Sequence, residues 1–283
     1  MDDLQTFLNV REMLANFLQE DVGAGDITSD SIIPADLEAT AEIVCKSRSA
    51  IVCGLEEASM IFDMCGCKSQ ILVKDGSKVR KGMVVMNVSG YARSILKAER
   101  TMLNLLMRMS GIATETRHMG ELAKGITILA TRKTAPGLRY FDKKAVVLGG
   151  GATHRMRLDD MVLIKDNHLV LASDLAKCIR LARKNVGSSI KLECEAGTKE
   201  EALAAVAAEA DTVMLDNFTP KQAEETISQI RRMGLRKKVK IELSGGINQY
   251  NIRHYSRSRP DFISLGYITH SSRAIDFSLK IMK

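Results

Sequence analysis

The sequence predicts an α/β protein in which a barrel follows a separate α+β domain. From about residue 126 onward, short apolar runs alternate with amphipathic stretches. Runs of this kind are typical of parallel strands that are buried on both faces and covered by helices. A polar or glycine-rich cluster follows nearly every run, which favours a barrel over an open sheet whose ligand binds at one switch point.

The predicted barrel strands are seven apolar runs, and the segments between them carry helix-start signals. The runs cover residues 126–130, 145–148, 161–164, 190–194, 212–216, 239–243 and 262–265. Thr198, with Glu201 three residues later, predicts a capping box at the start of one helix. Thr219 before Pro220 predicts the start of another. Strands and helices therefore alternate, as in βα units.

The first hundred residues lack this repeat and predict a different domain. A helix is expected over residues 3–20, and the stretch 37–90 mixes short strands with a helix near 54–64. Lys74-Asp75-Gly76 is a hairpin signal. A long helical stretch over 93–123, with Gly111 as a possible break, then leads into the barrel.

The composition predicts a globular protein of the cytoplasm. The chain has 283 residues, 45% of them hydrophobic, which is enough for a sizeable core. No stretch approaches the ~20 apolar residues of a membrane helix, and the acidic start MDDLQTF is unlike a signal peptide. The six cysteines are therefore expected to remain thiols. Cys65-Gly66-Cys67 lacks the second pair of a zinc site.

The net charge of +7 belongs to the second part of the chain. Residues 1–100 have a charge balance of −4 and residues 101–283 one of +11. A basic field attracts anions. Because aromatic residues make up only 4% and Trp is absent, small polyanions are favoured over nucleic acid as partners. A nucleic-acid-binding protein is the alternative from another class, and a salt-sensitive shift on DNA would reveal it.

Candidate site residues follow from the barrel, since active sites of such barrels lie at the carboxyl ends of the strands. The residues just past the apolar runs are Arg132, Lys133, His154, Arg155, Lys165, Glu195, Asp216, Ser244, Gly245, Gly246 and Gly266. Guanidinium and ammonium groups bind carboxylates and phosphates. Glycine-rich turns let backbone N–H groups approach a phosphate. This set suits a phosphorylated sugar donor and an acidic acceptor.

The two carboxylates and the turn leave alternatives open. Glu195 and Asp216 could hold Mg2+, steady a positively charged sugar in a transition state, or form barrel salt bridges. Gly245-Gly246 alone could be a tight turn. His154 and His168 could each be structural.

At these residues the sequence resembles the quinolinate phosphoribosyltransferase family, also called nicotinate-nucleotide pyrophosphorylases, from end to end. The matching motifs are Glu20-Asp21 with Gly25-Asp26-Ile27-Thr28, Glu99-Arg100-Thr101, Ser110-Gly111-Ile112-Ala113-Thr114, Thr131-Arg132-Lys133-Thr134, Gly149-Gly150-Gly151 with His154-Arg155, Ile164-Lys165-Asp166-Asn167-His168, Leu215-Asp216-Asn217, Ser244-Gly245-Gly246 and Gly266 with Thr269-His270-Ser271. The resemblance implies transfer of phosphoribose from phosphoribosyl pyrophosphate to quinolinate, with decarboxylation, in NAD biosynthesis.

The resemblance also implies roles for particular residues. The implied catalytic residues are Lys133, Lys165, Glu195 and Asp216, the last two holding Mg2+. The implied substrate-binding residues are these four with Arg100, Thr131, Arg132, His154, Arg155, Ser244, Gly245, Gly246, Gly266 and His270. Arg100 would reach the partner's pocket in a homodimer.

The implied fold is an amino-terminal α/β sandwich, residues 1–110, followed by an incomplete α/β barrel of six or seven strands, residues 111–270. A last helix, 271–283, would return to the first domain.

Three departures from the family pattern put exact substrate preference in doubt: Thr153 replaces the usual Asn, residues 157–160 read Arg-Leu-Asp-Asp in place of Gly-Leu-Ser-Asp, and Ala196-Gly197 follows Glu195. The rivals that share this chemistry or fold are a molybdenum-transport-associated paralogue and a nicotinate transferase that does not decarboxylate. The intact segments Ile164–His168 and Leu215–Asn217 disfavour the first, and the number of cations disfavours the second.

Overall fold

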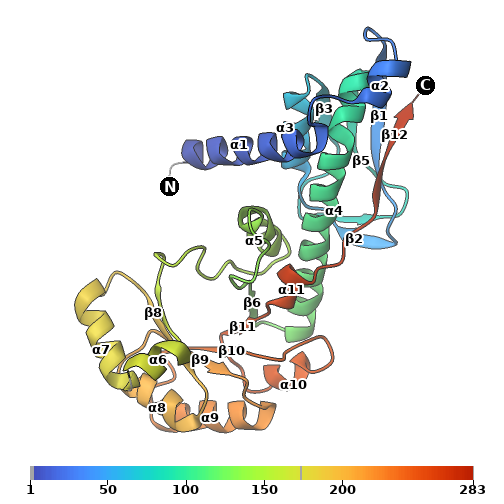
Figure 1. Ribbon diagram of the computed structural model, residues 1–283. Helices are drawn as coiled ribbons and strands as arrows, with labels where there is room; N and C mark the ends of the chain where they lie inside the picture. Colours follow the sequence, from blue (N-terminus) through green and yellow to red (C-terminus); the bar gives the residue numbers. More distant parts are fainter. Residues whose placement is uncertain (1–2, 173, 283) are drawn as a thin grey trace. The chain divides into compact units, whose positions relative to one another are not determined.

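The computed structural model describes residues 3–172 and 174–282 of the chain. Met1, Asp2, Ser173 and Lys283 lie outside the described residues, so the outer ends of the predicted segments 1–110 and 271–283 are not described. The chain divides into two compact units (Figure 1). The first comprises Met1–Glu115, Pro136–Gly149 and Ser271–Lys283, and the second Thr116–Ala135 and Gly150–His270. Pro136–Gly149 thus groups with the first unit, although it lies inside the span predicted for the barrel.

The first unit contains a four-stranded antiparallel sheet with the strand order β12-β1-β5-β3. Its strands are β1 (Glu38–Cys45), β3 (Lys68–Ile71), β5 (Val84–Tyr91) and β12 (Phe277–Met282), and β2 (Ser49–Ile51) pairs separately with β4 (Lys78–Arg80). Its helices are α1 (Asp3–Val22), α2 (Ile27–Ile32), α3 (Leu55–Met64), α5 (Arg139–Leu148) and most of α4 (Ala92–Ala123). The predicted helices near 3–20 and 54–64 are confirmed.

Residues 277–282 form strand β12 and residues 271–276 are not helical, so the predicted helix over 271–283 is wrong. Strand β12 pairs antiparallel with β1 in the register Phe277 to Cys45 through Met282 to Thr40. The segment Phe-Ser-Leu-Lys-Ile alternates apolar and polar side chains, which is the period of a strand. The C-terminal segment still belongs to the first unit, but it extends the sheet.

Helix α4 runs without a break through Gly111. A Cβ atom at this position would lie 2.0 Å from the backbone oxygen of Arg273. The predicted break is therefore wrong, and the glycine instead permits close approach of the C-terminal segment to the helix.

The predicted hairpin at Lys74-Asp75-Gly76 is also wrong, because β3 and β4 belong to different sheets. The segment does form a turn, with Gly76 at φ 84°. The Asp75 carboxylate accepts hydrogen bonds from the backbone N–H groups of Gly54 and Leu55, at 3.0 and 3.1 Å. The turn therefore caps helix α3 instead of joining two paired strands.

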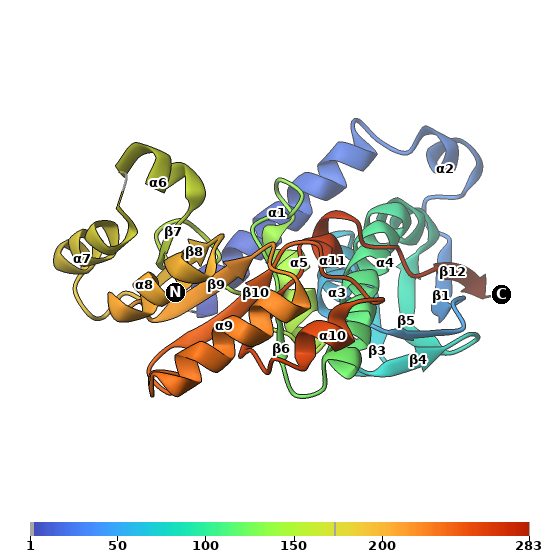
Figure 2. The same ribbon diagram turned by 90° about the horizontal axis from the view of Figure 1, so that it is seen from below.

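The second unit is an open α/β barrel built on a six-stranded parallel sheet with the order β6-β11-β10-β9-β8-β7. Its strands are β6 (Thr127–Leu129), β7 (Val162–Ile164), β8 (Leu192–Ala196), β9 (Thr212–Asp216), β10 (Lys240–Ser244) and β11 (Phe262–Ser264). Its helices are α6 (Asp166–Ala172), α7 (Leu175–Val186), α8 (Lys199–Ala207), α9 (Pro220–Arg232), α10 (Ile252–Ser256) and α11 (Tyr267–His270). Helices α7 to α10 lie along the outside of the sheet (Figures 1 and 2).

Six of the seven predicted strands are confirmed, and the seventh, residues 145–148, is the end of helix α5. In α5 the buried side chains include Phe141, Asp142, Ala145 and Val146, while Val147 is half exposed. This spacing of four residues is that of a helix packed on one face. The predicted capping box of Thr198 and Glu201 is present, and Thr219 caps α9 with Pro220 in its first turn.

None of the helices in the described part of the chain is both long and apolar enough to cross a membrane.

Candidate active site

The barrel strands project alternate side chains into one cavity of about 420 Å3 at their carboxyl ends. Because residues two apart on a strand face the same side, each strand can supply two residues to this cavity. Strand β8 supplies Glu195, β9 supplies Met214 and Asp216, and β10 supplies Glu242 and Ser244. The lining is completed by Ala130, Thr131, Arg132, Lys133, His154, Arg155, Leu163, Lys165, Asp166, Asn167 and Ser264.

The structure brings nine predicted site residues together in this lining: Thr131, Arg132, Lys133, His154, Arg155, Lys165, Glu195, Asp216 and Ser244. Gly266 and His270 lie next to it, since a Cβ atom on Gly266 would be 3.0 Å from Lys133 Cδ and 3.4 Å from the His270 ring. Arg100 belongs to α4 in the first unit and is exposed.

The cations and carboxylates of the cavity are partly paired. Lys165 Nζ lies 2.5 Å from Glu195 Oε2, and the Glu195 side chain is 12% exposed. Burial, and next the positive charge of Arg132, lower the pKa of Arg155. Two guanidinium groups held close enough to repel one another favour an anion between them.

The glycine turn after β10 packs tightly on the end of β9. Asn217 has φ 57°, and its backbone N–H donates to the Ser244 carbonyl at 2.9 Å. Gly245 has φ 93°, and a Cβ atom on it would lie 2.2 Å from Asn217 Oδ1. Only glycine fits this position. Of the three predicted turn residues, Ser244 is among the described residues that line the cavity, whereas Gly245 and Gly246 are not.

The sequence analysis missed three polar residues at the floor of the cavity, namely Glu193, Glu242 and Ser264. Glu242 and Ser264 line it, and Glu193 contacts His154 of the lining. Each lies two residues before a predicted site residue, Glu195, Ser244 or Gly266. The two-residue period of a strand is the signal that identifies them. Burial raises the pKa of both glutamates.

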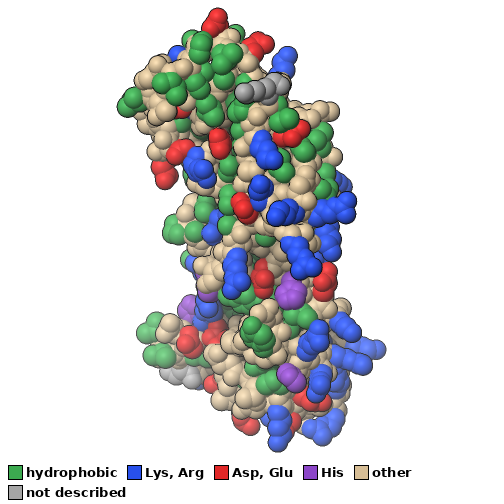
Figure 3. All heavy atoms as spheres, turned by 90° about the vertical axis from the view of Figure 1, so that its right-hand side faces the viewer, with side chains coloured by type: hydrophobic (Ala, Val, Ile, Leu, Met, Phe, Trp, Pro, Cys, Tyr) green, Lys and Arg blue, Asp and Glu red, His purple; other side chains and the backbone are tan. Residues whose placement is uncertain are grey.

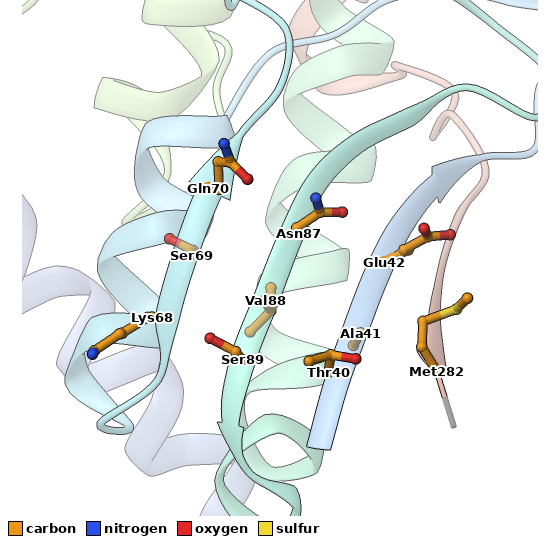
Figure 4. Close-up of a pocket in the computed structure, with 10 residues that line it drawn as sticks. All are labelled: Thr40, Ala41, Glu42, Lys68, Ser69, Gln70, Asn87, Val88, Ser89 and Met282. Atoms are coloured by element: carbon orange, nitrogen blue, oxygen red, sulfur yellow. The ribbon is translucent and has the colours of Figure 1, made fainter. Parts of the chain in front are cut away.

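Figure 3 shows Lys and Arg side chains gathered over part of the second unit. A second hollow, of about 360 Å3, lies on the four-stranded sheet of the first unit. Figure 4 shows four of its polar residues on neighbouring strands, namely Thr40, Glu42, Asn87 and Gln70. Among the described residues that line this hollow, Lys68 is the one cation. The barrel cavity is therefore the better site for a polyanion.

Two family models cover most of the chain: the N-terminal domain of quinolinate phosphoribosyl transferase matches residues 26–110, and its C-terminal domain residues 112–280. A protein of Methanothermobacter thermautotrophicus, named probable nicotinate-nucleotide pyrophosphorylase (carboxylating), is 40% identical over 274 residues, covering 95% of this chain and 98% of its own. The Arabidopsis thaliana nicotinate-nucleotide pyrophosphorylase (carboxylating), chloroplastic, is 38% identical and covers 93% of this chain and 80% of its own.

Solved structures agree with this assignment. The nicotinate-nucleotide pyrophosphorylase of Francisella tularensis superimposes with a TM-score of 0.90 at 36% identity, covering 96% of both chains. Human nicotinic acid phosphoribosyltransferase shares the fold alone, with a TM-score of 0.61 at 12% identity. The chain therefore belongs to the quinolinate phosphoribosyltransferase family.

Proposed function

We propose that this enzyme transfers the phosphoribosyl group of phosphoribosyl pyrophosphate to the ring nitrogen of quinolinate. The products are nicotinate mononucleotide, carbon dioxide and pyrophosphate, and the reaction belongs to NAD biosynthesis. Relatives named as carboxylating or decarboxylating transferases support this reaction. The observation that carries the proposal is the meeting of Arg132, Lys133, Arg155 and Lys165 with the predicted carboxylates Glu195 and Asp216 in one cavity, which Asp166 and Glu242 also line.

The cations would bind the negative groups of both substrates. Quinolinate carries two carboxylates, and the donor carries a phosphate and a pyrophosphate. Arg132 and Arg155 offer planar forks that suit carboxylates and phosphates, whereas Lys133 and Lys165 add compact charges. Thr131 supports this group, because its Oγ1 accepts a hydrogen bond from the Lys133 backbone N–H at 3.1 Å.

The 5-phosphate of the ribose would sit on the glycine turns. Ser244, Gly245 and Gly246 form one turn, and Gly266 begins another beside Lys133 and His270. Backbone N–H groups at such turns bind phosphate without a side chain in the way.

Glu195 and Asp216 fit Mg2+ by the chemistry of their donors, since Mg2+ prefers carboxylate oxygens together with water and phosphate oxygens. These two residues would hold Mg2+, which when bound would neutralise charge on the leaving pyrophosphate. The Lys165 ammonium already contacts Glu195, so it would keep that carboxylate in place before the metal and donor arrive.

The carboxylates would also act on the ribose itself. As pyrophosphate departs, the C1 carbon gains positive character, which Glu195 and Asp216 stabilise. The pyridine nitrogen of quinolinate then attacks C1. Once this nitrogen is quaternary, its positive charge stabilises the electron pair that the adjacent ring carbon keeps when the C–CO2 bond breaks and carbon dioxide leaves. A proton from solvent then adds to that carbon and gives nicotinate mononucleotide. No protein nucleophile is required.

We further propose a homodimer in which Arg100 completes the partner's site. The exposure of Arg100 supports this role. We also propose that the enzyme works in the cytoplasm. The six cysteines are free thiols, four of them buried, which suits a reducing compartment.

The test is a product assay with Mg2+, phosphoribosyl pyrophosphate and either quinolinate or nicotinate. Nicotinate mononucleotide from quinolinate alone is expected. Product from nicotinate alone would move the assignment to a transferase that does not decarboxylate, and no product from a folded sample would favour the molybdenum-associated paralogue.

A further inference from the structure

Two glutamates lie side by side at the floor of the barrel cavity, with a histidine ring above them. Glu193 of β8 and Glu242 of β10 are each 1% exposed. His154 Nε2 lies 2.9 Å from Glu193 Oε2 and 3.6 Å from Glu242 Oε2. Within the described residues, Glu193 Oε1 and both Glu242 oxygens have no hydrogen-bond partner. Because a buried carboxyl group without a donor is costly, the N–H of His154 matters to Glu193, the glutamate within hydrogen-bond distance of it.

The other ring nitrogen fixes the position of the ring proton. The backbone N–H of Arg155 donates to His154 Nδ1 at 2.7 Å. A backbone amide can only donate, so Nδ1 must be unprotonated, and the single ring proton is on Nε2. His154 is therefore neutral, with its N–H directed at Glu193. The residue has φ 49°, an uncommon backbone conformation that is often found at functional sites.

This proton position argues against a metal ion in the cluster. Ligand atoms of His154, Glu193 and Glu242 do lie within 4.8 Å of one another. A metal on Nε2 would require the ring proton to be on Nδ1, where it would face the Arg155 N–H. Metal-binding histidines instead donate their second ring N–H to an acceptor. The cluster is built for hydrogen bonding.

We infer that Glu193 is a positioning residue of the active site: it holds His154 as the neutral Nε2–H form, and His154 sets the backbone of Arg155. The part of this inference in which Arg155 binds a substrate anion rests on the proposed function. Arg155 is 8% exposed and lines the cavity, so a largely buried residue presents its guanidinium to the substrate anion. Both ring nitrogens of His154 are engaged, which gives it an indirect role in place of the predicted substrate contact.

The proton position is tested by 15N NMR of the full-length protein with labelled histidine rings. The signals of His154 are assigned by their absence from the His154→Gln variant. The expected spectrum has Nδ1 unprotonated and Nε2 protonated. A His154 ring protonated on both nitrogens, or on Nδ1 alone, overturns the inference. This measurement does not depend on catalysis.

The positioning role is tested by two substitutions at one site. Glu193→Gln keeps an oxygen that accepts the His154 N–H, whereas Glu193→Leu removes it. We expect Glu193→Leu to lower kcat/KM for quinolinate by about 100-fold, because a small misplacement of a binding group has an effect of this size. Glu193→Gln should recover most of the loss. Equal losses in the two variants contradict a hydrogen-bond role.

A double-mutant cycle connects Glu193 to Arg155. If the glutamate acts through Arg155, Glu193→Leu should cost little more in an Arg155→Ala background, whereas undiminished loss there overturns the inference. Tm values show whether each variant is folded. If Glu193→Leu unfolds, the cycle is carried out with His154→Ala in place of Glu193→Leu. A wild-type enzyme that is folded but does not turn over quinolinate would refute the proposed function, and the NMR result would still decide the state of His154.

Discussion

Lys165 Nζ lies 2.5 Å from Glu195 Oε2, joining the loop after β7 to the end of the neighbouring strand β8. The pair lies at the wall of the cavity, where Lys165 is 42% exposed and Glu195 12%. The ion pair holds the carboxylate in a defined place while leaving the ammonium accessible to an anion. We therefore expect both groups to act on substrate.

Glu195→Gln and Asp216→Asn should each lower kcat by about 100-fold or more, since each removes a charge that stabilises the transition state. Steady-state kinetics with quinolinate and phosphoribosyl pyrophosphate measures this, with Tm as the check on folding. Glu200→Gln, an exposed residue of α8, is the matched control and should leave kcat unchanged. Turnover near the wild-type value in either site variant would remove that carboxylate from the mechanism.

Gly245→Ala should weaken binding of phosphoribosyl pyrophosphate by about tenfold or more, because the new Cβ would displace the turn from Asn217. Gly246→Ala is the control for backbone strain alone. Its φ is also positive, 62°, but a Cβ there meets nothing within 4 Å. KM values for the donor compare the two. If Gly246→Ala raises KM as much as Gly245→Ala, the contact with Asn217 is not what matters.

Asp142→Ala should lower the free energy of unfolding by about 3 kcal/mol, because it leaves Arg108 without its carboxylate partner. Asp142 is fully buried, and its two oxygens accept hydrogen bonds from Arg108 Nε and Nη2, both at 2.8 Å. Urea unfolding measures the change. The double variant Arg108→Met, Asp142→Leu should recover much of the loss, and a double variant as unstable as Asp142→Ala would show that packing, not charge, sets the cost.

The proposed sharing of Arg100 predicts complementation between inactive subunits. Arg100→Ala and Asp216→Asn should each be nearly inactive alone, and a one-to-one mixture should regain about one quarter of wild-type activity. This fraction follows because half of the dimers are mixed and each has one intact site. Mixing is done under conditions that exchange subunits, with size-exclusion chromatography as the control. A mixture as inactive as its parents would place Arg100 outside the partner's site.

The sequence analysis predicted the barrel well because its signals are local. The confirmed strands lie in mostly apolar runs, and the caps at Thr198 and Thr219 need only residues three positions away. The strand predicted at residues 145–148 was wrong because a short apolar run can also be part of a helix. The helix predicted for 271–283 came from the resemblance, whereas the apolar and polar alternation of residues 277–281 already indicated a strand.

Most charged site residues were predictable because they lie at or just past the carboxyl end of a strand, whereas Arg155 follows a helix that was predicted to be a strand. Glu193 and Glu242 were not predicted because they lie inside the runs 190–194 and 239–243, where a single polar residue does not stand out from the strand. Their partnership depends on where His154 lies, and that position comes from a loop with a left-handed backbone. The tight contact between Gly245 and Asn217 joins the ends of two strands, so a single stretch of sequence does not reveal it.

The most direct test of the proposed activity measures two products at once. Quinolinate labelled with 14C in its 2-carboxylate is turned over with Mg2+ and phosphoribosyl pyrophosphate, and released carbon dioxide is counted against nicotinate mononucleotide. The proposal predicts one carbon dioxide for every nucleotide formed, and no nucleotide from nicotinate. Nucleotide formation without labelled carbon dioxide, or from nicotinate alone, would contradict it.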